Sequence, residues 1–345
     1  MCVMCACINR KREAAPDLMA MGKRIEGLWS GYYTGIGCLG DDQVIRSCKT
    51  TGWSKYWEQQ FSLKDVPGRM GFFHSRTGSG GDSRYAHPFL SRDGNCLLIS
   101  QGCAGIFAGR HENVVKTANM LFDRGVRFGS ADFNPQTRKY LRLADGSQIH
   151  ISDVACEYAA FLNGQGGDPL ETVRKTGTDI PEESVSLFIF KDHPGHIYIA
   201  NMNQRMFIVF DEDGVKLATC ALAMGDRRLC GIELPGNTAA DVTPDGIRME
   251  RMSDRLHPYL PVPANLEKAF LEWVKANPKT LLAHTMDNAL KTHYPEGVLR
   301  HVPTFEIFEK LYYDGVLALE TEEDRPGMDE MHKSILNWIV PGSLK

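Results

Sequence analysis

The chain has 345 residues, of which 43% are hydrophobic and 24% are charged, with 33 glycines and 17 prolines. This ordinary usage excludes a collagenous, mostly disordered or small disulfide-stapled protein, and the length predicts one large domain with an appendage, or two domains. The net charge of −4 at pH 7 indicates no broad surface for nucleic acid or anionic membranes. We therefore expect a small-molecule substrate, with no nucleic acid and no membrane as partner.

The start of the chain shows no export signal, and no segment holds about 18 uninterrupted apolar residues. We expect a soluble, cytoplasmic protein whose 10 cysteines are mostly free thiols. The one cysteine cluster is Cys2, Cys5 and Cys7, and no second pair at ligand spacing follows it. We therefore predict no metal and no organic cofactor.

Helical apolar spacing begins in the segment LMAMGKRIEGLWSG, and short apolar bursts between turn signals follow it. The bursts predict strands at residues 31–39, 68–76, 95–103, 184–192, 195–201, 205–214 and 215–224. Between the strand groups, helices are expected at residues 112–125, 151–167 and 169–177. The joins KDHPGH and DEDG are typical of hairpin turns, so the sheets should be antiparallel. This order predicts an α+β layered body over residues 1–235.

From residue 236 the pattern changes, and four segments carry apolar residues at three and four spacing. These segments are NLEKAFLEWVKANP, TLLAHTMDNALKTHYPEG, TFEIFEKLYYDGVL and MDEMHKSILNWIV. We expect a mainly helical C-terminal extension over residues 236–345. A helix, then Asp314-Gly315, then an alternating run is the outline of a winged helix. The acidic surface argues against DNA binding and favours the alternative, a packing or dimerisation appendage.

Cys2 directly follows Met1, and removal of Met1 would give a first residue with both a thiol and a free α-amine. The α-amine has an ordinary pKa of about 7.7 to 8.0, so it can take the thiol proton and return it to a leaving amine. Nucleophile and base would then share one residue. A chance Met-Cys start is the alternative.

A second segment, GFFHSRTGSGGDSRYAHP, carries Arg76 at a strand end before a glycine-rich loop. The planar fork of an arginine can hold a carboxylate through two parallel hydrogen bonds, which makes Arg76 the candidate for a substrate carboxylate. In the alternative reading, Arg76 forms a structural ion pair, and His74 and His87 are satisfied histidines at a turn.

A third segment, CLLISQGCAGIF, opens from an apolar strand into Gln101-Gly102. An amide side chain followed by glycine at a strand end can aim one side-chain N–H and one backbone N–H at the same point. That is the geometry an oxyanion hole requires.

Together these segments resemble the class II glutamine amidotransferases, which are N-terminal-nucleophile (Ntn) hydrolases. The shared features are the Met-Cys start, SGYYTGIG, HSRTG followed by AHP, the amide-Gly pair, and a helix near residues 157–162. The resemblance covers roughly residues 1–225. It implies a four-layer αββα sandwich with two antiparallel sheets, to which the C-terminal extension is added.

The resemblance also implies roles for individual residues. Cys2 would attack the side-chain amide of glutamine, forming a thioester and releasing ammonia before water releases glutamate. Gly102, with Gln101 where the family has asparagine, would form the oxyanion hole. The substrate-binding residues would be Arg76 for the α-carboxylate, His74, Thr77 and His87 in the surrounding loops, and Asp153 for the α-amine.

Several positions depart from the family pattern. Val3 and Ser30 replace a glycine and an arginine, Thr77-Gly78-Ser79 replaces Trp-Ala-Thr, and Gln101 lengthens an asparagine. An insertion between Gly129 and Ile149 has no counterpart and is expected to form a lid or contact surface.

These departures leave two alternatives to a glutaminase: an Ntn hydrolase for another small amide, and a catalytically silent regulatory module. The C-terminal extension shows no second active-site pattern. The ammonia acceptor is therefore expected on a separate synthase subunit, unless the amide is hydrolysed without transfer.

Overall fold

The computed structural model describes residues 2–102, 111–133, 141–143, 145–254, 265–293 and 301–342, without the side chains of residues 111, 226–229 and 301. Met1, the end of the predicted strand at 95–103 and part of the insertion at 129–149 lie outside these residues. Two large sheets form the body, with strand orders β13-β11-β12-β1-β4-β2-β3 and β15-β14-β10-β9-β6-β5. Neighbouring strands in both sheets run antiparallel, as the hairpin turns predict.

The strands of the first sheet include β1 at the centre, with Cys2 just before it. They are β1 (Val3–Asn9), β2 (Tyr33–Leu39), β3 (Ile45–Thr51), β4 (Met70–Arg76), β11 (Phe207–Asp211), β12 (Gly214–Ala218) and β13 (Gly231–Glu233). Those of the second sheet are β5 (Phe89–Leu90), β6 (Cys96–Gln101), β9 (Val185–Phe190), β10 (Ile197–Asn201), β14 (Thr238–Thr243) and β15 (Gly246–Arg251).

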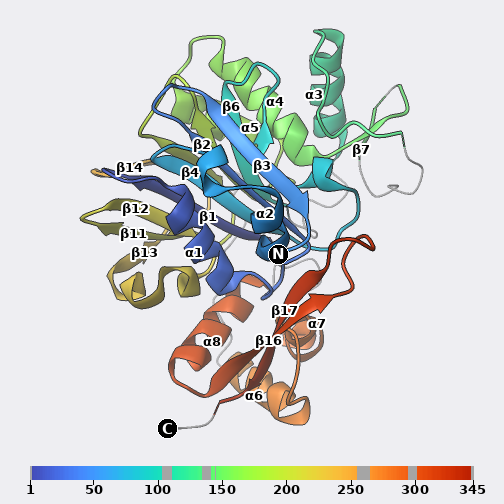
Figure 1. Ribbon diagram of the computed structural model, residues 1–345, viewed down its shortest axis with the longest axis vertical. Coiled ribbons are helices and arrows are strands. Elements are labelled where there is room, and N and C mark those ends of the chain that lie inside the picture. Colours follow the sequence, from blue (N-terminus) through green and yellow to red (C-terminus); the bar gives the residue numbers. More distant parts are fainter. Residues whose placement is uncertain are drawn as a thin grey trace.

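Alternation along the strands separates three apolar layers. Even-numbered residues of β1, such as Met4 and Ala6, pack between the sheets with Leu97 and Ile99 of β6. Odd-numbered residues of β1 face the helices that cover the first sheet, while α3, α4 and α5 cover the second sheet. Figure 1 shows α3, α4 and α5 at the top of the view, with the sheets beneath them. The predicted αββα sandwich is confirmed.

The helices of the body include four that lie close to their predicted places and one, α2, that was not predicted. They are α1 (Ala15–Ile25), α2 (Ser54–Gln60), α3 (His111–Asp123), α4 (Ile151–Asn163) and α5 (Pro169–Asp179), with 3₁₀ turns at Leu63–Asp65, Ser83–Tyr85 and Ala221–Cys230. A short ribbon, β7 (Leu141–Arg142) with β8 (Gln148–Ile149), lies inside the predicted insertion. None of the helices in the described residues is long and apolar enough to cross a membrane.

Beyond the body the chain forms a C-terminal module. It consists of α6 (Leu266–Ala276), α7 (Leu282–Ala289), a 3₁₀ turn (Lys291–His293), α8 (His301–Tyr313), β16 (Leu317–Arg325) and β17 (Ser334–Pro341). β16 and β17 pair as a hairpin, and Thr280, between α6 and α7, forms a single bridge to Ile339 of β17. In Figure 1 this module, coloured orange to red, lies below the sheets.

Two predictions for the C-terminal part are wrong. The chain does not become helical at residue 236, because β14 pairs with β10 and β15 with β14 in the second sheet. The segment MDEMHKSILNWIV is not a helix, because its second half is β17. Its apolar residues fit both periods, but residues 336–340 pair with residues 318–322 of β16.

Buried contacts fix the C-terminal module to the body. Glu309 of α8 accepts hydrogen bonds from Nη1 of Arg205 (2.8 Å) and from the backbone N–H of Ala221 (2.8 Å). The Phe305 ring of α8 stacks on Trp29, with ring centroids 6.0 Å apart. α8, the helix before the hairpin, is therefore buried against the body.

The hairpin of the module also binds the segment before β2. The backbone N–H of Asn337 donates to Gly27 O at 2.9 Å, and that of Ile335 donates to Gly31 O at 3.3 Å. The side-chain amide of Asn337 donates to Glu26 O at 2.6 Å. These bonds hold the segment that leads from α1 into β2.

Glu26 brings the surrounding elements together. Its buried carboxylate accepts hydrogen bonds from the Thr34 hydroxyl on β2 (2.8 Å), the Ser54 N–H at the start of α2 (3.1 Å), and the Ser75 hydroxyl on β4 (3.0 Å). Burial raises the pKa of Glu26, and these donors oppose that shift. One side chain thus ties together three elements near the end of β4.

We predict that Glu26→Ala lowers the free energy of unfolding by about 3 kcal/mol or more, because it leaves several buried donors without an acceptor. Glu26→Gln keeps one acceptor oxygen and should lose less. Urea denaturation measures both. The matched control is Glu58→Ala, which removes an exposed carboxylate paired with Lys23 and should cost no more than about 1 kcal/mol. Equal losses for Glu26→Ala and Glu58→Ala would contradict the role given to Glu26.

Candidate functional site

Cys2 and Arg76 meet at one end of the sandwich. β1 pairs with β4 through Val3 and Ser75, and continuing this register by one residue sets Cys2 opposite Arg76. Both residues fall on the alternation that faces the space between the sheets, where Met4 also points. Cys2 is half-buried and Arg76 is buried. The two residues therefore occupy adjacent positions at the same end of the inter-sheet space.

Arg76 is held in place at the start of the glycine-rich loop. Its Nη1 donates to Gly80 O at 3.0 Å, and its guanidinium lies 4.7 Å from the centroid of the Tyr33 ring. Thr77 follows at once and is half-buried. Ser79 donates its backbone N–H to Thr77 O at 2.8 Å, which folds the loop back on itself.

His74 and His87 lie against each other beneath this loop, with ring centroids 4.0 Å apart. Nε2 of His74 lies 3.1 Å from Ser100 O, and Nε2 of His87 lies 2.9 Å from Ser152 Oγ. Burial lowers the pKa of His74 to about 3 and lowers that of His87 as well. Both histidines are therefore neutral at pH 7.

Gln101 and Gly102 end β6 on the facing sheet. Residues Leu97 and Ile99 point between the sheets, so Gln101 points the same way, toward the layer that contains Cys2. Its Nε2 donates to Gln204 Oε1 at 3.1 Å, and its Oε1 has no hydrogen-bond partner within the described residues. The oxyanion role of this pair stays a prediction.

Glu183, which sequence reasoning missed, lies beside these groups. Its Oε1 accepts from the Ser152 hydroxyl at 2.7 Å, and Ser152 in turn accepts from the Ser100 hydroxyl at 2.8 Å. Its Oε2 would lie 3.6 Å from a Cβ added to Gly102. Burial raises the pKa of Glu183, and the positive charge of Arg76 opposes the shift. The only sequence signal was a carboxylate directly before an apolar strand.

The side chain of Asp153 points away from that of its neighbour Ser152. Its Oδ2 accepts from both the backbone N–H and the hydroxyl of Ser130, each at 2.7 Å. Consecutive residues of a helix point about 100° apart, so Ser152 reaches the histidines while Asp153 reaches Ser130. The assignment of Asp153 to a substrate amine stays a prediction, whereas Glu183 is the carboxylate that contacts the network around His87.

Lys49 is a second residue that the sequence did not reveal. It comes from β3, and its Nζ donates to Ala86 O at 2.7 Å, next to His87. Burial lowers the pKa of Lys49 to about 8. Gly35 on the adjacent strand also supports this turn, because a Cβ there would overlap His87 O.

The accessibility of Cys2 distinguishes it from its neighbours in the first strand. Cys5 and Cys7 are fully buried in the layer beneath α1, and burial raises the pKa of both thiols. A thiol that stays protonated is a poor nucleophile. Cys2, just before this strand, is therefore more accessible than Cys5 and Cys7.

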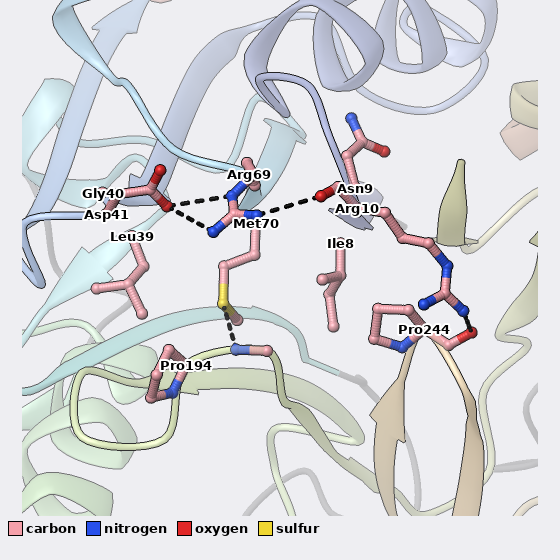
Figure 2. A pocket seen from close by; sticks show the side chains of 11 residues that line it. Ile8, Asn9, Arg10, Leu39, Gly40, Asp41, Arg69, Met70, Pro194 and Pro244 are labelled. Atoms are coloured by element: carbon pink, nitrogen blue, oxygen red, sulfur yellow. Dashed lines mark hydrogen bonds and ion pairs between the residues drawn. The ribbon is translucent and has the colours of Figure 1, made fainter. Parts of the chain in front are cut away.

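No group of three or more His, Cys, Asp or Glu side chains among the described residues could hold a metal ion. A cavity of about 350 Å³ lies at the opposite end of the sandwich, with Ile8, Leu39 and Met70 on its floor. Figure 2 shows that its Arg69 is bound to Asp41. It lies at the far ends of β1 and β4 from Cys2 and Arg76, so it is not part of the candidate site.

The buried histidines predict a specific pH dependence. The folded-state pKa of His74, about 3, is below its unfolded value of about 6.5. Its contribution to stability is therefore present above pH 6.5 and is lost as the pH falls toward 3. We expect His74→Gln to be less stable than wild type at pH 7.5, with the difference shrinking by about 2 kcal/mol by pH 5. Denaturant unfolding at several pH values measures this, and a difference independent of pH would contradict it.

Curated proteins of one name are similar in sequence to this chain. The chain is 26% identical over 225 residues to a glutamine–fructose-6-phosphate aminotransferase of Clostridium tetani, covering 60% of this chain and 35% of that protein. It is 32% identical over 104 residues to the protein of that name from Methanothermobacter thermautotrophicus, covering 30% of this chain and 17% of that protein. The matches thus span about a third or less of these relatives. No protein-family model matches the sequence.

Among solved structures, the fold is similar to that of the glutamine phosphoribosylpyrophosphate amidotransferase of B. subtilis. The TM-score is 0.58 at 11% identity, and the superposition covers 97% of this chain and 71% of that one. Both curated relatives and this structural neighbour are glutamine-dependent transferases. The chain is therefore similar to glutamine amidotransferases, in sequence to the curated relatives and in its Ntn-hydrolase fold to the solved structure.

Proposed function

We propose that the chain hydrolyses the side-chain amide of glutamine, with Cys2 as the N-terminal nucleophile. The observation that carries the proposal is the β1–β4 register, which sets Cys2 opposite Arg76. A nucleophile and a carboxylate-binding cation at one edge suit a small substrate that carries both an amide and a carboxylate. Glutamine is such a substrate.

Each step of the reaction needs the α-amine of Cys2 to be free, and therefore requires removal of Met1 and of anything before it. The thiol gives its proton to the α-amine, and the sulfur attacks the amide carbon. The tetrahedral intermediate collapses as the α-amine returns the proton to the leaving nitrogen, so that ammonia departs and a thioester remains. Water then attacks the thioester and releases glutamate and the thiol.

Other residues would position the substrate for this attack. Arg76 would bind the α-carboxylate with its planar fork, and the Thr77 to Gly81 loop would close around it. Gly102 N–H and the Gln101 amide would receive the negative oxygen of the tetrahedral intermediate. His74 and His87 are neutral and hydrogen-bonded to serines, so we assign them an architectural role beneath the loop.

We propose that the ammonia goes to an acceptor bound by a separate synthase subunit. The curated relatives are named for transfer to fructose 6-phosphate, and the similarity covers only about a third of the Clostridium protein's length. The C-terminal module of this chain lies against the glycine-rich loop after Arg76. A Cβ added to Gly78 of this loop would lie 3.2 Å from Met328 Sδ of the module. We infer that the module braces this loop.

A second candidate function is hydrolysis of a different small amide. It is favoured by Gln101, whose Nε2 is already bonded to Gln204. A donor displaced by about 1 Å can lower the rate about 10²-fold, so a pocket of changed shape would suit a changed substrate. Release of ammonia from a panel of amides separates the two candidates.

The nucleophile can be tested by mass spectrometry with a chloroketone analogue of glutamine that alkylates thiols. We expect a chain without Met1 that gains one adduct on Cys2, at a rate that excess glutamine reduces. Arg76→Ala should label about 10²-fold more slowly, because it loses charge-assisted hydrogen bonds worth about 3 kcal/mol.

The matched control for this labelling is Cys230→Ala, which removes an exposed thiol outside the site. Labelling of Cys2 should be unchanged in this variant. Iodoacetamide, which lacks the carboxylate, should label wild type and Arg76→Ala equally. Retention of Met1, or an adduct on Cys230 with none on Cys2, would refute the assignment of the nucleophile.

Loss of the oxyanion donor gives a separate prediction. Gln101→Ala should lower kcat for glutamine hydrolysis by about 10² to 10³-fold with a smaller effect on KM, because the donor acts mainly on the tetrahedral intermediate. Coupled measurement of glutamate release gives both constants. Gln204→Ala removes a hydrogen-bond partner of Gln101 but leaves the Gln101 amide in place, so it should lower kcat less. A kcat within about threefold of wild type for Gln101→Ala would exclude this role.

A further inference from the structure

A cleft of about 550 Å³ lies on the outer face of the second sheet, away from the candidate site. Three segments line it: the turn before β6 with Arg92, the turn after α3 with Arg124 and Arg127, and the middle of α4 with Glu157 and Phe161. The turn before β6 is at the other end of that strand from Gln101, about 17 Å away at the usual rise per residue. The cleft is therefore a separate feature of the molecule.

The three arginines of this cleft are held by backbone carbonyls. Arg92 Nε donates to Arg127 O at 2.6 Å, Arg124 Nη1 to Met120 O at 3.3 Å, and Arg127 Nη1 to Phe122 O at 3.1 Å. None of the three forms an ion pair within the part of the chain that the structure describes. Their positive charges are thus fixed in place without being neutralised.

The backbone under these arginines is also fixed. α3 ends in a Schellman motif, with Gly125 at φ +89° and Val126 N–H bonded to Leu121 O at 3.1 Å. Aromatic rings support two of the guanidinium groups, since Arg127 lies 4.3 Å from the centroid of Phe122 and Arg124 lies 5.4 Å from that of Phe161. Binding an anion here would require little ordering of side chains.

Several other exposed arginines in the described part of the chain form ion pairs. Arg46 pairs with Asp42, and Arg174 pairs with Glu171, each at 2.6 Å. At the cavity in Figure 2, Arg69 pairs with Asp41. Arg10, which also lines this cavity, pairs with Asp245. Grouped, unpaired arginines are therefore a feature of the cleft beside α4.

Two carboxylates also line the cleft. Asp93 accepts hydrogen bonds from Ser91 and Asn95 within its own turn. Glu157 accepts from the backbone N–H of Arg92 at 2.8 Å, and burial raises its pKa to about 7. Even with both carboxylates charged, the three arginines of the cleft exceed its two negative charges.

We propose that this cleft binds a small organic anion that carries a phosphate group. Planar guanidinium forks match phosphate oxygens through paired N–H donors, and three forks suit its several oxygens better than the two of a carboxylate. The volume exceeds what phosphate alone needs, and Val126, Ala160 and Phe161 offer apolar surface for the rest of the ligand. α4 begins at Ile151, next to Ser152 of the candidate site, so one helix joins the two places.

The test measures binding rather than activity, and so does not depend on the proposed glutaminase reaction. Thermal unfolding of the full chain is followed while inorganic phosphate or pyrophosphate is added at constant ionic strength, with chloride as the reference anion. We expect a saturable rise in Tm that chloride does not produce. In Arg124→Gln/Arg127→Gln the apparent affinity should fall at least tenfold.

Two control variants locate the effect. Arg174→Gln removes an exposed arginine elsewhere and should keep the phosphate response. Arg76→Ala should also keep it, which would exclude the candidate site as the place of binding. Absence of a saturable response in wild type, or an unchanged response in the double variant, would overturn the proposal and leave the three arginines a purely structural role at the end of α3.

Discussion

The carboxylate of Glu26 is removed from water and is compensated by donors on β2, on α2 and on β4. A buried charge or dipole of this kind is tolerated only where its hydrogen bonds are supplied. That requirement links elements that are distant in sequence, because none of them alone could satisfy it. The C-terminal module adds to the same point, since Asn337 binds the backbone carbonyl of Glu26. The end of β4 is consequently one of the most constrained parts of the molecule.

The candidate site depends on that constraint. Ser75, which donates to Glu26, lies between His74 and Arg76 in β4, and alternation sends those two neighbours to the opposite face. The bond to Glu26 thus fixes β4 on the face that packs against the helices. His74 and Arg76 point from the other face into the space between the sheets. Cys2 reaches the same space because β1 pairs antiparallel with β4. Cys2 and Arg76 are thus held by two adjacent strands, whose register allows little adjustment.

Burial then separates groups that the sequence alone treats alike. His74 and His87 are kept neutral because they are desolvated near Arg76. The same desolvation raises the pKa of the thiols of Cys5 and Cys7, while Cys2, just before the start of the central strand β1, is half-buried. Glu183 is equally desolvated, and burial raises its pKa, while hydrogen bonds from Ser152 and Ser100 and the charge of Arg76 oppose that shift. Position in the sandwich, not residue type, decides which groups are suited to chemistry.

Local patterns in the sequence were enough to predict an antiparallel α+β body, most of its strands and helices, and the segments around Cys2, Arg76 and Gln101, while the αββα layers came from the family resemblance. These signals succeed because alternation, helical spacing and turn residues act within a few positions of the chain. β14, β15 and β17 were missed because their pairing partners decide their structure, and short apolar runs fit either period. Glu183, Ser152 and Lys49 were missed because their importance comes from contacts across 31 or more residues, such as Ser152 with Glu183. The sequence by itself determined the fold class and which residues could carry the chemistry. Only the tertiary structure decided which of them meet and which are desolvated, because both depend on the packing of segments far apart in the chain.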